Sequence, residues 1–303
     1  MIRFESDELK NLDTASLQLL VPLHGVLMGK EIVDNWERVE QFQARPDDVL
    51  ISTYPKAGTT WMSEIVDMIF CDGDPEKCRR ETIYNRVPYL EFRIPGEPSG
   101  VEQLEATPSP RLVKTHLPIK LMPDSFWGKN CKVIYVARNA KDVAVSYFFF
   151  HKMVKALPDP GPWDKFLDDY IKGDVGYGSW YDHVIGWWEK RNDYRILYLF
   201  YEDMKEDPKR EIRKILHFLE KEMREEVIDK IVHHTSFQEM KNNDMVNYKT
   251  IPNELMDQST TSFMRKGIAG DWKNHFTVSQ NEIFDEDYKK KMSGTNLHFR
   301  MEI

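Results

Sequence analysis

Residues 52–61 read Ser-Thr-Tyr-Pro-Lys-Ala-Gly-Thr-Thr-Trp, and this stretch decides the fold. The apolar, β-prone run 49–51 precedes it, and apolar residues at helical spacing follow over 61–69. It therefore joins the end of a strand to the start of a helix. The free N–H groups of a helix N-terminus attract anions, Gly58 lets the backbone approach one closely, and Lys56 adds a full positive charge. We interpret the stretch as a phosphate-binding loop.

This loop differs from the phosphate loop of nucleoside triphosphatases. Their motif, G-x-x-x-x-G-K-[ST], places the lysine after the second glycine. Here Lys56 precedes Gly58, and the standard motif occurs nowhere else in the sequence. Taken alone, the segment also fits an ordinary strand–turn–helix connection.

Composition and charge bound the class of protein. The 303 residues are 41% hydrophobic and 30% charged, and no linker or repeat divides them, so we expect one domain over 1–303. A net charge of −8 argues against nucleic acid as a partner. No stretch has membrane-spanning length, no signal-peptide core opens the sequence, and Cys71, Cys78 and Cys131 suggest reduced thiols without zinc-type spacing. We expect a cytoplasmic protein without membrane contact.

The other apolar runs predict a regular framework. Strands alternating with helices indicate an α/β fold with a central parallel sheet flanked by helices. Segments 1–45, 84–110 and 234–303 are expected to consist mainly of loops, with short helices in the first. The strands are expected at 48–54, 111–116, 132–137 and 195–200, and the helices at 59–70, 139–150, 181–190, 208–219 and 222–233.

Chemistry-bearing residues follow the predicted strands, and ligands of parallel sheets bind at the strands' carboxyl ends. His116 ends one strand, and Lys114 lies on the same face. A neighbouring cation lowers a histidine's pKa, so His116 is a candidate general base; a hydrogen-bonded structural histidine is the alternative. Arg138 with Ser146, two helical turns on, indicates a second anion site or a capping network. Residues 265–267, Arg-Lys-Gly, can add charge to that anion.

Four motifs, in order and spread over nearly the whole chain, resemble those of the cytosolic sulfotransferases, most closely the phenol (aryl) subfamily. The resemblance implies that the donor of the sulfuryl group is 3′-phosphoadenosine 5′-phosphosulfate (PAPS), that adenosine 3′,5′-bisphosphate (PAP) is the product, and that no metal is required. It also makes the loop a P-loop-like phosphosulfate-binding loop. The motifs are Tyr54-Pro55-Lys56-Ala57-Gly58-Thr59-Thr60-Trp61, Lys114-Thr115-His116-Leu117-Pro118, Arg138-Asn139-Ala140-Lys141-Asp142 through Ser146-Tyr147, and Arg265-Lys266-Gly267.

The resemblance also assigns residues to the donor. It places the loop 56–61 on the 5′-phosphosulfate, Arg138 and Ser146 on the 3′-phosphate, and Tyr201 at the adenine. The complete donor set that it implies is Lys56, Ala57, Gly58, Thr59, Thr60, Trp61, Arg138, Ser146, Tyr201, Thr235, Ser236, Phe237, Met240, Phe263, Met264, Arg265, Lys266 and Gly267.

For the reaction, the resemblance implies His116 as the base and Lys56 as the group that stabilises the leaving phosphate. Ser146 holds Lys56 until both substrates are bound, and Lys114 lies on the acceptor side. The implied acceptor is a small phenolic compound: phenols, catechols, iodothyronines and oestrogens stay open. The sequence departs from the family pattern at Tyr89, Glu97, Leu157 and Leu255. These departures leave the choice among the four acceptor classes undecided. The acceptor pocket is expected to contain Lys114, His116, Tyr89, Phe92, Phe150 and Tyr248.

Two further points concern partners and rival functions. Residues 273–282 resemble the family's dimerisation motif, K-x-x-x-T-V-x-x-x-E, which implies a homodimer; a surface loop entering a helix is the alternative. A P-loop-type kinase would need ATP and Mg²⁺, and a non-catalytic PAP-binding protein would bind PAP without transfer. The presence of both Lys56 and His116 favours transfer over these two alternatives.

Overall fold

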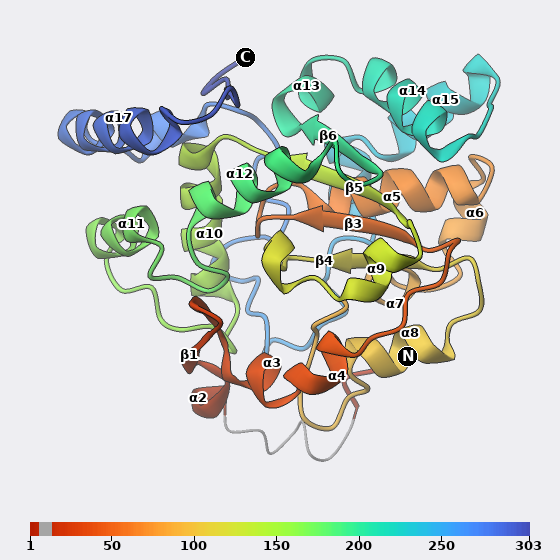
Figure 1. Cartoon of the computed structure of the whole chain (residues 1–303), viewed down its shortest axis with the longest axis horizontal. Helices are drawn as coiled ribbons and strands as arrows, with labels where there is room; N and C mark the ends of the chain where they lie inside the picture. The colour runs from red at the N-terminus through yellow and green to blue at the C-terminus, as the bar shows by residue number, and fades with distance from the viewer. Residues whose placement is uncertain (6–13) are drawn as a thin grey trace.

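A four-stranded parallel sheet forms the centre of the molecule (Figure 1). The computed structural model describes residues 1–5 and 14–303. The strand order is β4-β3-β5-β6, so the strand that leads into the phosphate loop, β3, lies inside the sheet. The predicted parallel α/β sheet is confirmed. The strands are β3 (Val49–Thr53), β4 (Leu112–Thr115), β5 (Lys132–Ala137) and β6 (Ile196–Phe200).

Helices cover both faces of this sheet. Every residue of β3 is buried, as expected for a strand covered on two sides. Leu50 packs in one apolar cluster with residues of the helices α10 (Ala140–Met153) and α12 (Trp180–Lys190). Val49 and Ile51 pack in another cluster with residues of α5 (Thr59–Phe70), α14 (Pro208–Leu219) and α15 (Glu225–His234). Because side chains alternate along a strand, those of β3 pack into two apolar cores, one on each face of the sheet.

The helices are connected mostly by short loops. They are α2 (Thr14–Leu17), α3 (Lys30–Asp34), α4 (Trp36–Glu40), α5 (Thr59–Phe70), α6 (Pro75–Cys78), α7 (Ile83–Arg86), α8 (Gly100–Ala106), α9 (Asp124–Gly128), α10 (Ala140–Met153), α11 (Trp163–Lys172), α12 (Trp180–Lys190), α13 (Tyr201–Glu206), α14 (Pro208–Leu219), α15 (Glu225–His234), α16 (Phe237–Asn242) and α17 (Val278–Met292), with 3₁₀ turns η1 (Ile119–Leu121) and η2 (Asp271–Asn274).

The five expected helices are all present, with small shifts at their ends. For α10, the predicted N-cap is confirmed, because the Asn139 side chain accepts a hydrogen bond from the Asp142 amide. The helix expected at 222–233 begins only at Glu225, because Arg224 is its extended N-cap.

The segments expected to be mainly loops also contain regular elements. Residues 20–29 form an antiparallel hairpin of β1 (Leu20–Leu23) and β2 (Val26–Gly29), whose four-residue strands are too short for a clear pattern. Helix α8 begins at a capping box within 84–110. Helix α17 also begins at a capping box, and it has little apolar periodicity because only Phe284 and Met292 are buried.

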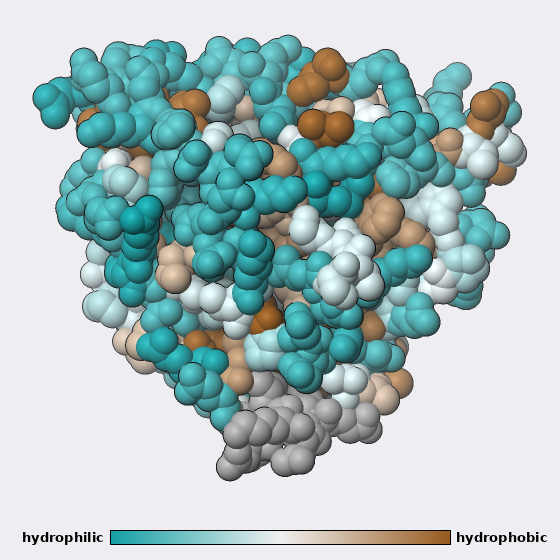
Figure 2. Space-filling model, turned by 180° about the vertical axis from the view of Figure 1, so that it is seen from behind, coloured by the Kyte–Doolittle hydropathy of each residue, from teal (hydrophilic) through white to brown (hydrophobic). Residues whose placement is uncertain are grey.

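One face of the molecule is predominantly polar. On the face seen in Figure 2, hydrophilic residues predominate and hydrophobic ones appear in small separate groups. Within the described part of the chain, none of the helices combines the length and the apolar character needed to cross a bilayer.

Candidate active site

A cavity of about 440 Å³ lies where the sheet's carboxyl edge meets the loops that follow it. The phosphate loop after β3, His116 after β4, Arg138 after β5 and Tyr201 after β6 all line it. Each of these residues directly ends a strand or begins the next turn. The parallel register therefore brings together side chains that are far apart in the sequence.

The phosphate loop has an unusual backbone. Gly58, the N-cap of α5, has a φ of 113°, and a Cβ there would lie 3.1 Å from the Tyr201 ring. Lys56 also has a positive φ, 68°, which is rare for a side-chain-bearing residue. The first N–H groups of α5 have no partner within the helix. The loop therefore combines an anion-attracting helix end with a lysine held in a constrained conformation.

The Lys56 ammonium lies between two aromatic rings. Its Nζ is 4.0 Å from the centroid of the Phe150 ring and 4.2 Å from that of Phe263. Burial, together with the charges of Arg138 and Arg265, lowers the pKa of Lys56 to about 7. In the described structure, Lys56 makes its side-chain contacts with these rings and forms no hydrogen bond with Ser146, although both residues line the cavity.

His116 has a defined tautomer. Its Nδ1 lies 2.8 Å from the Thr53 carbonyl oxygen, which can only accept, so Nδ1 carries the proton and Nε2 is free to accept one. Burial is the main factor that lowers the pKa of His116 to about 3; the predicted effect of Lys114 is real but smaller. The Lys114 ammonium itself donates to the Tyr248 hydroxyl at 3.2 Å. The imidazole is neutral at physiological pH, as a base must be.

Two groups beside His116 were missed by sequence reasoning. The buried Glu91 carboxylate accepts hydrogen bonds from the His116 amide and the Thr115 hydroxyl, both at 2.7 Å, and burial raises its pKa to about 7. The Tyr177 ring lies beside the imidazole, 5.6 Å between ring centroids, and its hydroxyl contacts that of Tyr89. Only the glycines on either side of Tyr177 hinted at a turn there.

A second group of cations adjoins the phosphate loop. Arg138 donates to the carbonyls of Lys56 and Ile268, and its buried Nε has no partner among the described atoms. Arg265 and Lys266 both pair with the Asp271 carboxylate. At Gly267, a Cβ would come within 2.1 Å of the Phe237 ring, so only glycine fits. The charges suit a polyanionic ligand in a chain of net charge −8.

The cavity gathers nearly all the residues expected at the site. Within the described structure, Ala57 and Ser236 are the two that do not line it: Ala57 is fully buried, and the Ser236 hydroxyl caps α16. Of the four residues that depart from the family pattern, Glu97 lies outside the cavity wall, and its carboxylate accepts a hydrogen bond from the Arg3 amide. The expected residues on the wall are Lys56, Gly58, Thr59, Thr60, Trp61, Tyr89, Phe92, Lys114, His116, Arg138, Ser146, Phe150, Tyr201, Thr235, Phe237, Met240, Tyr248, Phe263, Met264, Arg265, Lys266 and Gly267.

Comparison with known proteins identifies the family. The model of the sulfotransferase domain matches residues 46–296. Sulfotransferase 1 family member D1 of Rattus norvegicus is 61% identical over 284 residues, which cover 94% of this chain and 96% of that protein. The chain belongs to the sulfotransferase family. Sulfotransferase 1B1 of Canis lupus familiaris is 60% identical over 93% of this sulfotransferase and 95% of the relative.

Solved structures agree with the fold. Mouse sulfotransferase SULT7A1, complexed with PAP, has a TM-score of 0.74 and 33% identity, covering 91% of this chain and 96% of its own. Retinol dehydratase, in a complex with retinol and PAP, has a TM-score of 0.83 and 27% identity. The match covers 94% of this chain and 93% of the retinol dehydratase chain. This sulfotransferase therefore shares the architecture of proteins that hold PAP.

Proposed function

We propose that the protein transfers the sulfuryl group of PAPS to the hydroxyl of a small phenolic acceptor, with 1–303 acting as one domain. Family membership supports the sulfuryl transfer itself. The observation that carries the proposed mechanism is the tautomer of His116, whose unprotonated Nε2 shares a cavity with the Lys56 ammonium. A proton acceptor and a cation in one cavity are what transfer from an anionic donor to a hydroxyl requires.

PAPS is the donor and PAP the product, as in the family, and the residues present fit them. Their phosphates would be held by Lys56 and the loop on one side and by Arg138, Ser146, Arg265 and Lys266 on the other. The partnerless Arg138 Nε supports this assignment, since a buried guanidinium nitrogen calls for an acceptor. Tyr201, stacked on Arg138 at 4.3 Å, and Trp61 would lie near the adenine. When bound, PAPS supplies the activated sulfuryl group.

The proposed chemistry needs only side chains of this chain around the two substrates. His116 Nε2 takes the proton of the acceptor hydroxyl as its oxygen attacks in line. Lys56 donates to the phosphate oxygen that leaves the sulfur and offsets its developing charge. Glu91 and the Thr53 carbonyl hold the His116 backbone and ring in position.

The acceptor side of the cavity is aromatic. Tyr89 and Tyr177 contact each other beside His116, and Phe92, Phe150 and Tyr248 continue the wall. Flat rings of this kind favour a planar aromatic acceptor over a flexible polar one. Phenols, catechols, iodothyronines and oestrogens all remain within this class.

The remaining proposals concern place and assembly. We propose that the protein works in the cytoplasm, supported by three cysteines that are all buried and free in the described structure. We also propose a homodimer through residues 273–282, supported by Val278, whose side chain is 77% exposed at the start of α17. An exposed valine at a helix start is a suitable apolar contact for a second copy.

The first experiment is a product assay. The protein is incubated with PAPS and 1-naphthol in metal-free buffer, and aryl sulfate and PAP are both quantified, with a PAP-binding measurement in parallel. Equal amounts of the two products are expected. PAP binding without product would contradict the phenolic acceptor and favour a binding-only protein, and transfer from ATP with Mg²⁺ would favour the kinase. Neither binding nor product would contradict the whole proposal.

A further inference from the structure

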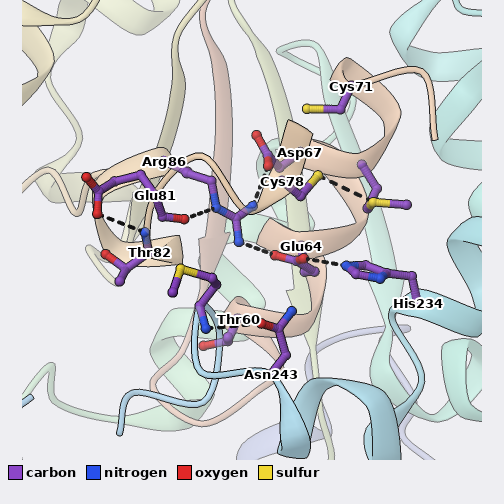
Figure 3. A network of polar contacts seen from close by, with 12 residues as sticks. Thr60, Glu64, Asp67, Cys71, Cys78, Glu81, Thr82, Arg86, His234 and Asn243 are labelled. Atoms are coloured by element: carbon purple, nitrogen blue, oxygen red, sulfur yellow. Dashed lines mark hydrogen bonds and ion pairs between the residues drawn. The ribbon is translucent and has the colours of Figure 1, made fainter. Parts of the chain in front are cut away.

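A buried ion network lies along α5, the helix whose first turn belongs to the phosphate loop (Figure 3). Arg86 of α7 forms ion pairs with Glu64 and Asp67 of α5, and all three side chains are at most 1% exposed. Arg80 reaches the other oxygen of Asp67 at 2.6 Å. His234, the last residue of α15, contacts Glu64 at 3.2 Å. The network therefore joins α5 to the segment before the donor residue Thr235.

Two thiols adjoin this network. Cys71 follows the last residue of α5, and Cys78 is the last residue of α6. Their sulfur atoms and an Asp67 oxygen all lie within 4.8 Å of one another. All three cysteines are free in the described structure, and the turn between α5 and α6 brings two of them together.

The cluster does not suit a metal ion. Asp67 is the only carboxylate in it, and both its oxygens already accept from the guanidinium groups of Arg80 and Arg86. A cation placed there would face two arginines and displace their pairing. The two thiols are therefore considered for oxidation rather than for metal binding.

We propose that Cys71 and Cys78 form a reversible disulfide, and that this bond, at one end of α5, weakens binding at the phosphate loop at the other end. The oxidant is a hydroperoxide. The Cys71 thiolate attacks its terminal oxygen, which gives Cys71 sulfenic acid and releases the alcohol, or water in the case of hydrogen peroxide. The Cys78 thiol then attacks the Cys71 sulfur and water leaves, so the two thiols lose two electrons and two protons in all.

The surroundings fix the order of these steps. The Arg80 guanidinium lies 3.3 Å from the Cys71 sulfur, and Cys71 is 8% exposed against 1% for Cys78. The neighbouring Cys78 thiol and the charge of Arg80 lower the pKa of the Cys71 thiol, whereas the Cys71 thiol and burial raise the pKa of Cys78. Cys71 is accordingly the attacking thiol and Cys78 the resolving one.

Oxidation must change the local packing. A disulfide requires the sulfurs to approach to about 2.05 Å. Cys78 then gives up its contact with the Met68 sulfur, 3.4 Å away, and Cys71 its contact with Arg80. Because Arg80 also pairs with Asp67, the change reaches the network that anchors α5. In the cytoplasm such a bond is transient and responds to redox conditions.

The test uses the whole protein in chelator-containing buffer. Wild type, Cys71→Ser and Cys131→Ser are treated with a small excess of hydrogen peroxide, and intact mass, peptide maps and PAP affinity are measured before and after reduction by dithiothreitol. Cys131 is the matched control, a third buried thiol that bonds the Arg45 carbonyl instead. After peroxide treatment, the intact masses of the wild type and of Cys131→Ser should each fall by two hydrogens, and their peptide maps should contain a peptide linking Cys71 to Cys78. Cys71→Ser should show neither change.

PAP affinity in the oxidised wild type should fall on the order of fivefold, the low end of typical coupling between sites, and return on reduction. The affinity readout rests on the proposed donor, whereas the mass readout does not, so the two can fail separately. Stable sulfenic or sulfinic acid without a cross-link would overturn the disulfide. A cross-link that leaves PAP affinity unchanged would overturn the coupling to the phosphate loop.

Discussion

The proposed mechanism needs a neutral His116 and a charged Lys56, yet their shared environment pushes both toward neutrality. Burial lowers the pKa of His116 to about 3 and that of Lys56 to about 7. For a base this is favourable, because the imidazole is unprotonated whenever the acceptor arrives. For the lysine it works against the charge that the leaving group requires. The anionic donor resolves the conflict, since a nearby negative charge raises a lysine's pKa.

Lys56 should therefore take up a proton when PAP binds. Near pH 8 the free protein holds this group largely unprotonated, and the bound anion raises its pKa through that pH, so protons move from buffer to protein. Calorimetric titrations in two buffers of different ionisation enthalpy should give different apparent binding enthalpies. Lys56→Met is the control and should lose the difference. Identical enthalpies for the wild type in both buffers would contradict the assigned charge state.

Replacing His116 by alanine should lower turnover roughly 10²–10⁴-fold, the usual contribution of a general base. PAP affinity should be unchanged, because the ring bonds the Thr53 carbonyl and none of the cationic groups. His151→Gln is a matched control: His151 also lines the cavity with a lowered pKa and bonds a carbonyl through Nδ1, but it lies in the last turn of α10 rather than at a strand end. The control should stay within about tenfold of the wild type. Comparable losses in both variants would argue against a specific base.

At the scale of elements, α5 is the structural link between chemistry and stability. Its first turn forms the phosphate loop, and its middle carries Glu64 and Asp67, which are buried and bonded to Arg86. Buried carboxylates are costly unless paired. The short helix α7 thus fixes α5 against the sheet, and the chain continues from it directly to Tyr89 on the acceptor wall.

Arg86→Met should destabilise the fold by about 3–5 kcal/mol, the usual cost of removing one partner from a buried ion pair. Urea unfolding of the variant and the wild type measures this change. Arg79→Met serves as the control, because its pair with Glu76 is 61% and 72% exposed and should contribute about 0–1 kcal/mol. A loss below about 1 kcal/mol for Arg86→Met would show that the network contributes little to stability.

For the whole molecule, sequence patterns predicted the features that depend on short segments of the chain. The four central strands and five helices follow from apolar runs, and strand-end residues such as His116 and Arg138 meet because parallel strands share an edge. Glu91 and Tyr177 were not predictable, because only tertiary packing places them beside His116. Helix α17 was missed because its end cap, rather than a buried stripe, defines it.

The proposed dimer also belongs to this scale. Val278→Glu should shift the protein to monomer in a sedimentation series over concentration, since a short contact cannot absorb a charge at its centre. Leu19→Glu, another exposed apolar position at 52%, lies outside residues 273–282 and should leave the assembly unchanged. A wild type that is monomeric at every concentration, or a dimer that survives Val278→Glu, would contradict the proposed interface.

One part of the cavity wall packs apart from the two main cores. Ile2, Phe4 and Leu255 form a small apolar cluster of their own, apart from both main cores, with Phe92 packed against it. Such a wall can diverge between gene copies while the sheet edge that handles the donor is inherited unchanged. One ancestral fold can in this way give rise to enzymes with different acceptor specificities. Directed evolution can follow the same route by randomising Ile2, Phe92 and Leu255 and selecting for new acceptors with donor use retained.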